Sequence, residues 1–411
     1  MATAALNRPS KMTVRQWIFL LLLVLSIGIN YIDRGSLSIA GPLMLKELKL
    51  DPYQFGILLS AFFWTYAPMQ LVAGWLVDRF NVNLVYAVGF LAWSAATLLT
   101  GFIGSFIGLL ILRTILGMGE SVAYPSYSKI LTANFREHHR GLANGLIDMG
   151  SKFGPALGVL LGGLFMAQYG WRVFFYSMGI ASLLWLIPWY FFAPRDVIAE
   201  KIDMTHAPGF MRIMSIRSAW GNFFGLFCSN YVWYFILTWL PYYLKNERNY
   251  TVNQMATLGS LPYWVVGISS AIAGVVSDRL VSRGGRAVRT RKLMIAAGLI
   301  GTTIILPSAM IQDQRLSLFL LMIGCFSFGF FSGIHWALAQ SLAGPLASGK
   351  WTGLANAVGN VAGVVAPWFT GWVVTETGKF YYAFVVCAAF CLLGACCYAV
   401  IIDRNDPVQW N

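Results

Sequence analysis

The sequence has 411 residues, of which 58% are hydrophobic and 11% are charged, and its mean hydropathy is +0.65. Soluble domains average about 25% charged residues, so this composition excludes a soluble protein and indicates a chain that crosses a membrane many times. The formal net charge of +13 raises the question of nucleic acid. No cluster of Lys and Arg is interleaved with aromatic residues, and we expect no nucleic-acid partner.

Long apolar runs dominate the chain, and they lack the alternation that a membrane β-barrel requires. Because backbone groups must be satisfied inside a bilayer, we expect helices throughout. The predicted segments are 16–42, 53–77, 82–102, 105–132, 140–168, 171–193, 216–245, 254–279, 291–311, 315–343, 351–374 and 380–402. The fold class is therefore an all-α membrane protein with twelve transmembrane helices in two six-helix halves.

The longest link between segments, 194–215, is charged and contains two prolines near the middle of the chain. We interpret residues 1–193 as an N-terminal six-helix bundle, 194–215 as a cytoplasmic linker and 216–411 as a C-terminal six-helix bundle. With the N-terminus inside, the inner links carry 19 Lys and Arg and the outer links carry 7. This bias predicts that both termini are cytoplasmic.

The first segment holds Asp33 and Arg34 deep within its apolar run. Charges at the bilayer centre are unfavourable by roughly 2.5–3.5 kcal/mol each. Adjacent helical residues point about 100° apart, so the two side chains cannot face one spot. We expect one of them to line a cavity while the other pairs with a neighbouring helix.

Segment 105–132 carries Arg113 and Glu120 in an otherwise apolar stretch. Seven helical residues turn through about 700°, so both side chains leave the same face, roughly 10 Å apart along the axis. Such charges persist where they line a wet cavity or meet partners on other helices. We interpret them as the floor of a transport pathway; the alternative is an ion pair that only holds helices together.

Polar residues recur four positions apart, which places them on one face of a helix. The pairs are Tyr66 with Gln70, Asp148 with Lys152, Asn230 with Tyr234, and Asn356 with Asn360. Such groups can bind substrate hydroxyls or join helices, and we favour Tyr66 and Asn356 as substrate contacts. Asp148 and Lys152 either neutralise each other or leave Lys152 as a second anion contact. His335 stands alone and is interpreted as a hydrogen-bonded packing residue.

A short motif repeats 200 residues apart, as GWLVDR at 74–79 and GVVSDR at 274–279, each closing the second segment of its half. Glycine permits close helix contact, and Asp and Arg at the membrane surface can bridge neighbouring helix ends. We expect conformational gating from Gly74, Asp78, Arg79, Gly274, Asp278 and Arg279. A parallel repeat of six-helix halves is typical of one transporter architecture.

These motifs carry a family resemblance. GWLVDRF resembles the loop motif of the major facilitator superfamily, although Val82 and Asn83 replace the usual basic pair. More narrowly, four stretches are similar to its anion:cation symporter family, which includes bacterial galactonate, glucarate and hexuronate permeases, sialin and the vesicular glutamate transporters. The stretches are NYIDRGSLSIAGP (30–42), SAFFWTYAPMQLVAGWLVDRF (60–80), LRTILGMGESVAYPS (112–126) and WYFILTWLPYYL (233–244). The resemblance implies proton-coupled movement of organic anions, often sugar acids, by alternating access.

The resemblance also implies roles by position. Asp33 and Glu120 match proton-coupling acids, Arg34 and Arg113 match anion-binding and charge-pairing arginines, and Tyr66, Gln70 and Asn356 match polar pocket positions. Where sugar-acid permeases often carry Gln in segment 140–168, this chain has Ser151 and Lys152, which leaves the exact substrate open.

The side-chain chemistry of Arg34, Glu120 and Asp33 predicts more specific roles for them. The fork of an arginine stays charged and fits a carboxylate, so we expect Arg34 to hold the substrate carboxylate. Glu120 is expected to take up and release a proton as the cavity changes access, with Asp33 as a second site. The substrate-binding candidates are Arg34, Arg113, Tyr66, Gln70, Lys152, Asn230, Tyr234, Asn356 and Asn360.

The sequence therefore predicts a proton-coupled symporter of the bacterial inner membrane that imports a sugar acid, an aldonate, aldarate or uronate. The alternatives are an organic-anion exchanger or uniporter, or a symporter of another carboxylate such as an aromatic acid or dicarboxylate. An enzyme is not expected, because no HExxH, GxSxG or clustered His is present. We expect neither cofactor nor metal, and a monomer in the lipid bilayer.

Overall fold

The computed structural model describes residues 12–135, 137–194 and 208–410, and every regular element in these ranges is helical. The first half contains α1 (Val14–Leu48), α2 (Pro52–Arg79), α3 (Val82–Thr100), α4 (Phe106–Glu120), α5 (Ala123–Asn134), α6 (Glu137–Leu157), the π-helix η2 (Gly158–Gly162) and α7 (Gly163–Phe192). The rest contains α8 (Phe210–Met214), α9 (Arg217–Tyr242), η3 (Tyr243–Glu247), α10 (Val252–Ser282), α11 (Ala287–Thr302), α12 (Ile305–Met310), α13 (Gln314–Ser332), α14 (His335–Thr377), α15 (Tyr381–Cys396) and η4 (Cys397–Ile401).

The two halves repeat in how their helices begin. At the start of α2, the Asp51 side chain accepts a hydrogen bond from the backbone N–H of Gln54 at 2.7 Å, and the Gln54 side chain accepts one from the backbone N–H of Asp51 at 3.3 Å. At the start of α10, Thr251 and Gln254 make the same capping box. These reciprocal bonds satisfy N–H groups that a helix start leaves unpaired. Their offset of 200 residues equals that of the repeated sequence motif.

Eleven stretches within the described residues are long and apolar enough to cross a membrane. One of them, 143–192, has 50 residues, more than twice what a span requires. Gly170 interrupts it with a φ of +81°, a backbone conformation that favours glycine, so it contains two of the predicted segments. Gly344, with a φ of +64°, likewise divides α14. The predicted all-helical, twelve-segment fold is confirmed, although segment 105–132 is two helices rather than one.

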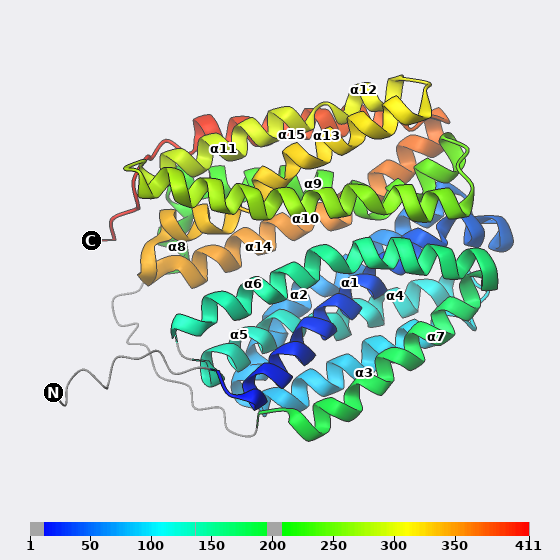
Figure 1. Cartoon of the computed structure of the whole chain (residues 1–411), viewed down its shortest axis with the longest axis horizontal. Helices are drawn as coiled ribbons and strands as arrows, with labels where there is room; N and C mark the ends of the chain where they lie inside the picture. The colour runs from blue at the N-terminus through cyan, green and yellow to red at the C-terminus, as the bar shows by residue number, and fades with distance from the viewer. Residues whose placement is uncertain (1–11, 136, 195–207, 411) are drawn as a thin grey trace.

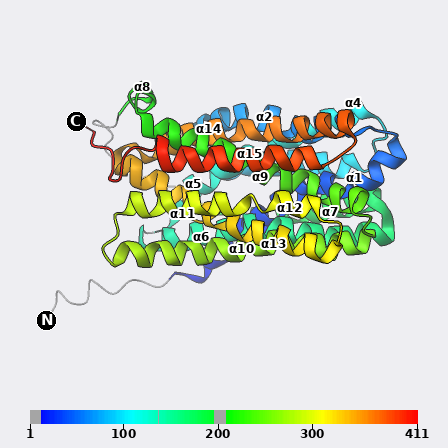
Figure 2. The same cartoon turned by 90° about the horizontal axis from the view of Figure 1, so that it is seen from above.

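The helices lie side by side along the long axis of the molecule, with α1–α7 in one bundle and α9–α15 in the other (Figures 1 and 2). The start of α1 and the end of η4 lie at the same end, which we call the terminal end; the opposite end is the distal end. The connection between the bundles runs past Phe192 to Arg217, and its residues 195–207 lie outside the described part of the chain.

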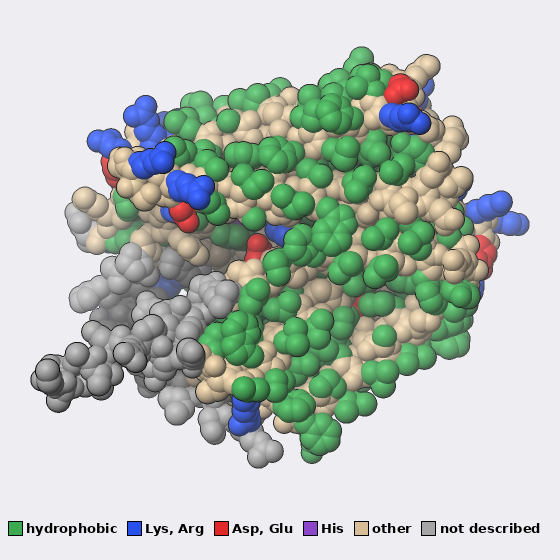
Figure 3. Space-filling view, in the orientation of Figure 1, with side chains coloured by type: hydrophobic (Ala, Val, Ile, Leu, Met, Phe, Trp, Pro, Cys, Tyr) green, Lys and Arg blue, Asp and Glu red, His purple; other side chains and the backbone are tan. Residues whose placement is uncertain are grey.

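The surface fits a lipid environment. Figure 3 shows hydrophobic side chains over the middle of one face, with Lys, Arg, Asp and Glu toward the two ends. Exposed apolar side chains of this kind include Leu71, Ile107, Leu184 and Tyr190. A soluble monomer rarely exposes so much contiguous apolar surface, and a bilayer core would cover it.

The bundles meet through α1 with α9, α2 with α14, and α6 and α7 with α10. In the distal part of this interface, Ser38 Oγ donates a hydrogen bond to the carbonyl of Thr238 at 2.5 Å. A Cβ atom at Gly56 would lie 2.7 Å from the carbonyl oxygen of Pro367, so the backbones of α2 and α14 touch there. Figure 3 shows the surface hollowed between the bundles on the terminal side. The bundles are therefore closed distally and parted toward the terminal end.

Candidate substrate and proton site

The centre of the site is an ion pair between Arg34 of α1 and Glu120, the last residue of α4. Arg34 Nη2 and Nε donate to the same oxygen, Glu120 Oε2, at 2.9 and 3.1 Å. Arg34 Nη2 also donates to Asn30 Oδ1 at 3.3 Å, one turn earlier on α1. Both charged side chains are buried, and none of the described residues forms a hydrogen bond with Glu120 Oε1. Glu120 therefore pairs with another helix, not with Arg113 of its own helix.

Aromatic rings enclose the guanidinium of Arg34. Its Cζ lies 4.6 Å from the ring centroid of Tyr31, 4.7 Å from that of Phe62 and 4.6 Å from that of Tyr66. The faces of such rings attract a cation, and they replace part of the hydration that burial removes. We call Tyr31, Phe62 and Tyr66 the aromatic collar. The collar holds Arg34 in one place while leaving the charge unneutralised except by Glu120.

Asp33 of α1 and Arg113 of α4 lie inside the N-terminal bundle, in a compartment separate from the Arg34–Glu120 pair. They line one small cavity, whose walls are Asp33, Ser36, Leu37, Thr97, Thr100, Leu112, Arg113, Leu116 and Phe175. Within the described ranges of the chain, neither carboxylate oxygen of Asp33 has a hydrogen-bond partner, and the side chains of Asp33 and Arg113 are both buried. Arg113 Cζ is 5.6 Å from the ring of Phe62, so one collar ring lies between the two arginines. The four charges are thus split between two adjoining compartments.

The C-terminal bundle contributes polar groups to the same region. Asn356 of α14 donates to Gln70 Oε1 of α2 at 3.1 Å, which is a direct hydrogen bond between the bundles. Tyr234 donates to Asn360 Oδ1 at 2.7 Å, and its ring lies 4.5 Å from that of Phe63 across the interface.

Asn230, also on α9, instead donates to the backbone carbonyl of Gly359 at 3.1 Å. This bond joins α9 to α14 within the C-terminal bundle. Of the polar pairs predicted from the sequence, Gln70 and Asn356 therefore face each other between the bundles, whereas Asn230 joins helices of one bundle.

The sequence profile of the Major Facilitator Superfamily matches residues 23–348 and 223–411. The chain belongs to the major facilitator superfamily. Its members are membrane transporters and not enzymes, and the fold, the internal repeat and the buried charges of α1 and α4 agree with that membership.

Two bacterial transporters align with this chain over nearly its whole length. A probable sulfoacetate transporter of Cupriavidus necator is 32% identical over 384 residues, with 89% of each chain covered. A probable galactarate/D-glucarate transporter of Escherichia coli is 30% identical over 420 residues, with 94% of each chain covered. The fold also matches a bacterial homolog of the human lysosomal transporter Spinster, solved in an inward-facing, unoccupied conformation. The TM-score is 0.81 at 18% identity, covering 96% of this chain and 98% of that one.

Lys152, at the departure from the sugar-acid permease pattern, is half-buried on α6. Its Nζ lies 5.7 Å from the ring centroid of Trp233 on α9, so the side chain reaches into the C-terminal bundle. Asp148, one turn earlier, is exposed, and among the described residues no salt bridge joins it to Lys152. Of the two alternatives left open by the sequence, this conformation does not show the self-neutralising Asp148–Lys152 pair.

The repeated motif lies at the terminal ends of α2 and α10. Asp278 of α10 accepts a hydrogen bond from Arg291 Nη2 of α11 at 3.2 Å. Arg291 Nη1 also donates to the carbonyl of Ala337 and to Ser341 Oγ on α14, at 3.2 and 2.5 Å. Asp278 thus helps to tie three helices together, and Arg291 is the partner that sequence reasoning missed.

The other motif positions make looser contacts. Arg79 and Arg279 are exposed, and Arg79 Cζ lies 5.5 Å from the ring centroid of Trp75. The side chain of Asp78 lies outside the described part of the structure. A Cβ atom at Gly74 or Gly274 would meet nothing within 4 Å. The close helix contact expected at these two glycines is therefore absent in this conformation.

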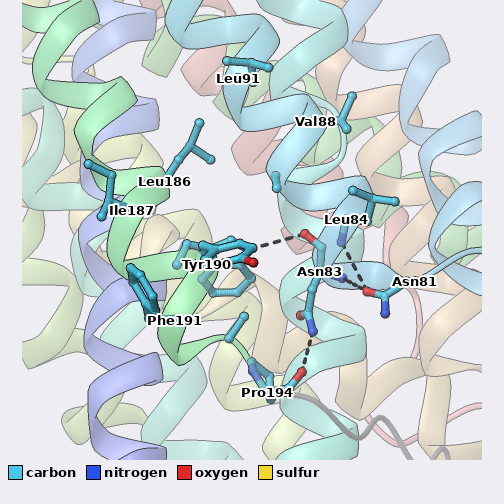
Figure 4. A pocket seen from close by; sticks show the side chains of 13 residues that line it. Asn81, Asn83, Leu84, Val88, Leu91, Leu186, Ile187, Tyr190, Phe191 and Pro194 are labelled. Carbon is cyan, nitrogen blue, oxygen red and sulfur yellow. Dashed lines mark hydrogen bonds between the residues drawn. The ribbon is translucent and has the colours of Figure 1, made fainter.

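A larger pocket lies away from the ion pair, between α3 and α7 on the outer side of the N-terminal bundle (Figure 4). Its walls include the exposed side chains of Leu84, Val88 and Ile187. Asn83 Nδ2 donates to the carbonyl of Pro194 and Asn81 caps α3, whereas the buried Asn83 Oδ1 has no partner among the described residues. This groove faces the surrounding lipid and offers no charge to a substrate.

Sequence reasoning missed most of the collar. Phe62 precedes Tyr66 by four residues, so the same-face rule that selected Tyr66 and Gln70 also includes Phe62. Tyr31 lies three residues before Arg34, within reach along the helix. Trp233 could not be found this way, because its importance comes from Lys152 on another bundle.

Proposed function

We propose that this transporter is a symporter that imports an organic anion, a sugar acid, together with one or more protons by alternating access. The observation that carries the proposal is the buried Arg34–Glu120 pair beside the interface between the bundles. Arg34 offers N–H groups that suit a carboxylate, and its present partner is an acid that a proton can neutralise.

Competition for Arg34 explains how proton and anion would be coupled. A substrate carboxylate needs the same Nη2 and Nε donors that Glu120 occupies. Protonation of Glu120 removes its charge and weakens its hold on Arg34, which then accepts the anion. The anion and the proton would thus enter together, and release of the proton would return Glu120 to Arg34 and expel the substrate.

Asp33 is proposed as a second proton site. Its carboxylate is buried without a hydrogen-bond partner, an unfavourable state for an ionised group that a proton would relieve. Arg113, in the same cavity, is placed to act as its charge partner rather than as a direct substrate contact.

The substrate class rests on the polar groups near Arg34 and on the relatives. Tyr66, Gln70 and Asn356 can contact hydroxyls, as a polyhydroxylated acid requires. A relative that covers 94% of the chain is a probable galactarate/D-glucarate transporter. An aldonate, aldarate or uronate therefore fits better than an aromatic acid.

The setting of the transporter is part of the proposal. The excess of 19 over 7 basic residues on alternate links supports a cytoplasmic location of the terminal end, in a bacterial inner membrane. We place the N-terminal bundle at 1–193, the linker at 194–215 and the C-terminal bundle at 216–411, acting as a monomer. The conformation described would then be open to the cytoplasm.

The test is uptake into proteoliposomes of the purified protein, with labelled galactarate, galactonate and glucuronate supplied outside. With an alkaline interior, a proton symporter accumulates substrate above the outside concentration, and a protonophore abolishes the accumulation. Uptake that only equilibrates identifies a uniporter, and uptake that requires internal anion identifies an exchanger. Either result, or failure to transport any sugar acid, would overturn the corresponding part of the proposal.

A further inference from the structure

Lys152 bridges the two bundles, and no residue that the structure describes serves as its counter-ion. Its Cβ lies 3.6 Å from the position that a Cβ at Gly267 of α10 would take, so the residue starts at the α6–α10 contact. Its ammonium then extends over the Trp233 ring of α9. A half-buried ammonium against an aromatic face, with no carboxylate paired to it, is a candidate binder of an anionic group.

The position of Lys152 along the pathway follows from how α6 packs on α1. A Cβ at Gly150 would lie 2.5 Å from Ile27, and one at Gly154 would lie 2.9 Å from Tyr31 Cβ. Lys152 is therefore level with residues 27–31, on the terminal side of Arg34. Lys152 and Arg34 are therefore separated by roughly 5–10 Å along the axis of α1. A six-carbon diacid, with five C–C bonds of about 1.5 Å, spans a comparable roughly 6 Å between its carboxyl carbons.

His335 supplies a second, independent feature on the same row of aromatic rings as Lys152. It is connected to Trp233 through ring contacts, from Trp233 to Phe328 at 6.2 Å, Phe328 to Phe331 at 5.3 Å and Phe331 to His335 at 4.7 Å. This row of rings thus connects His335 with Trp233, the ring over which the Lys152 ammonium lies.

The hydrogen bonds of His335 determine what it can bind. Nδ1 lies 3.3 Å from the carbonyl oxygen of Ser332, and a carbonyl can only accept, so the proton of the neutral ring is on Nδ1. Nε2 is then an acceptor. This nitrogen is buried, in a residue that is 6% exposed, and has no hydrogen-bond partner in the part of the chain that the structure describes. A donor such as a substrate hydroxyl would satisfy it.

We infer that Lys152 and His335 form a second subsite, which binds the far α-hydroxycarboxylate end of a sugar diacid. The Lys152 ammonium pairs with the far carboxylate, His335 Nε2 accepts from the neighbouring hydroxyl, and Arg34 holds the near carboxylate. This inference rests on the proposed function and narrows it to aldarates. A monoacid would place a neutral hydroxymethyl group beside Lys152 and leave its charge unpaired.

The test compares affinities of the purified full-length transporter for matched ligands by titration calorimetry. The ligands are galactarate with galactonate, glucarate with gluconate, and adipate, a six-carbon diacid without hydroxyls. We expect each aldarate to bind at least about tenfold more tightly than its aldonate and than adipate, as a lost charged hydrogen bond implies.

Variants separate the two contacts. Lys152→Gln is expected to reduce the aldarate-to-aldonate ratio to about one while leaving aldonate affinity within about twofold, and Lys152→Arg is expected to keep most of the ratio. His335→Phe is expected to reduce the aldarate-to-adipate ratio, whereas His335→Gln keeps an acceptor and retains it. Thermal unfolding without ligand identifies any variant that simply fails to fold.

Three outcomes would overturn the inference. Equal affinity of the wild type for aldarates and aldonates shows that no second anion subsite exists, while the proposed sugar-acid transport still stands. An equal loss of affinity for every ligand in Lys152→Gln assigns Lys152 to packing alone. Binding of none of the sugar acids shows that the proposed substrate class itself is wrong, and the subsite is rejected with it.

Discussion

Asn356 of α14 donates a hydrogen bond to Gln70 of α2 across the interface between the bundles, at 3.1 Å. Contacts between these two helices continue toward the distal end, where a Cβ at Gly363 would lie 2.4 Å from Phe63 and one at Gly56 would lie 2.7 Å from Pro367. The Asn356–Gln70 bond is thus at the edge of the closed part of the interface, facing the parted side.

Removing this bond should loosen the distal closure. We expect Gln70→Ala and Asn356→Ala each to weaken the closed state by about 0.5–1.5 kcal/mol, with little added effect in the double variant, because they share one bond. The measurement is labelling of a cysteine introduced at Ser38, which is buried in the closed interface, by an impermeant maleimide from the distal side. The protein that keeps Ser38 gives the background level of maleimide labelling. Unchanged labelling in both single variants would contradict this role.

A substitution at Gly56 should disrupt the distal closure of the two bundles by steric clash. An alanine there would place Cβ 2.7 Å from the Pro367 carbonyl and 3.3 Å from Gly371 Cα, and backbone atoms cannot move aside as a flexible side chain can. We therefore expect Gly56→Ala to open the distal end and raise labelling of Ser38→Cys several-fold while transport slows. Gly35→Ala is the matched control, because a Cβ at Gly35 meets nothing within 4 Å. If Gly56→Ala labels like Gly35→Ala, the close approach does not govern access.

The sequence was informative about the fold because hydropathy alone determines where a chain can cross a bilayer. The predicted segment 53–77 corresponds to α2, Pro52–Arg79, and segment 82–102 to α3, Val82–Thr100. Helix breaks were harder to predict. Nothing in the apolar pattern of 105–132 signals that α4 ends at Glu120, which is where the backbone turns before α5.

Pairing between helices was beyond the reach of the sequence. Periodicity placed Arg113 and Glu120 on one face and Asp33 and Arg34 about 100° apart. In the structure Asp33 and Arg34 do lie in different compartments, but Arg113 lines the Asp33 cavity while Glu120 pairs with Arg34. Which arginine Glu120 meets depends on how α1 packs against α4, and the structure selects Arg34. Asp148 and Lys152 illustrate the same limit. Their spacing of four residues permits an ion pair, but it does not reveal that the Lys152 ammonium lies over the Trp233 ring of another helix.

Asp403, just after η4, should make stability depend on pH. Its carboxylate accepts a hydrogen bond from Ser218 Oγ at 2.5 Å, and this bond, helped by the charges of Arg217 and Arg404, lowers the pKa of Asp403. A lowered pKa means that the contribution is present above the unfolded pKa of about 3.9 and is lost as the pH falls through the folded value.

We therefore expect Ser218→Ala to lower the thermal unfolding temperature slightly at pH 7 and by less at pH 3. The effect is small because Asp403 is exposed and solvent screens its interactions. Thermal unfolding in detergent at the two pH values, with Ser215→Ala as a control whose hydroxyl bonds only the local backbone, is the measurement. An equal decrease at both pH values would mean that the hydroxyl acts through packing and not through the Asp403 charge.

Glu120→Gln is the sharpest test of proton coupling. The amide cannot ionise, so the competition for Arg34 no longer depends on pH, and Arg34 remains free to bind an anion. We expect ΔpH-driven accumulation in proteoliposomes to fall to background, while exchange of labelled for unlabelled substrate continues, because exchange requires no net proton movement. Glu47→Gln is the matched control: Glu47 is also on α1, but it is exposed at the distal end and pairs with Arg172 at 3.0 Å. If Glu120→Gln still concentrates substrate against its gradient under ΔpH, the proton is carried elsewhere, and Asp33 becomes the residue to examine.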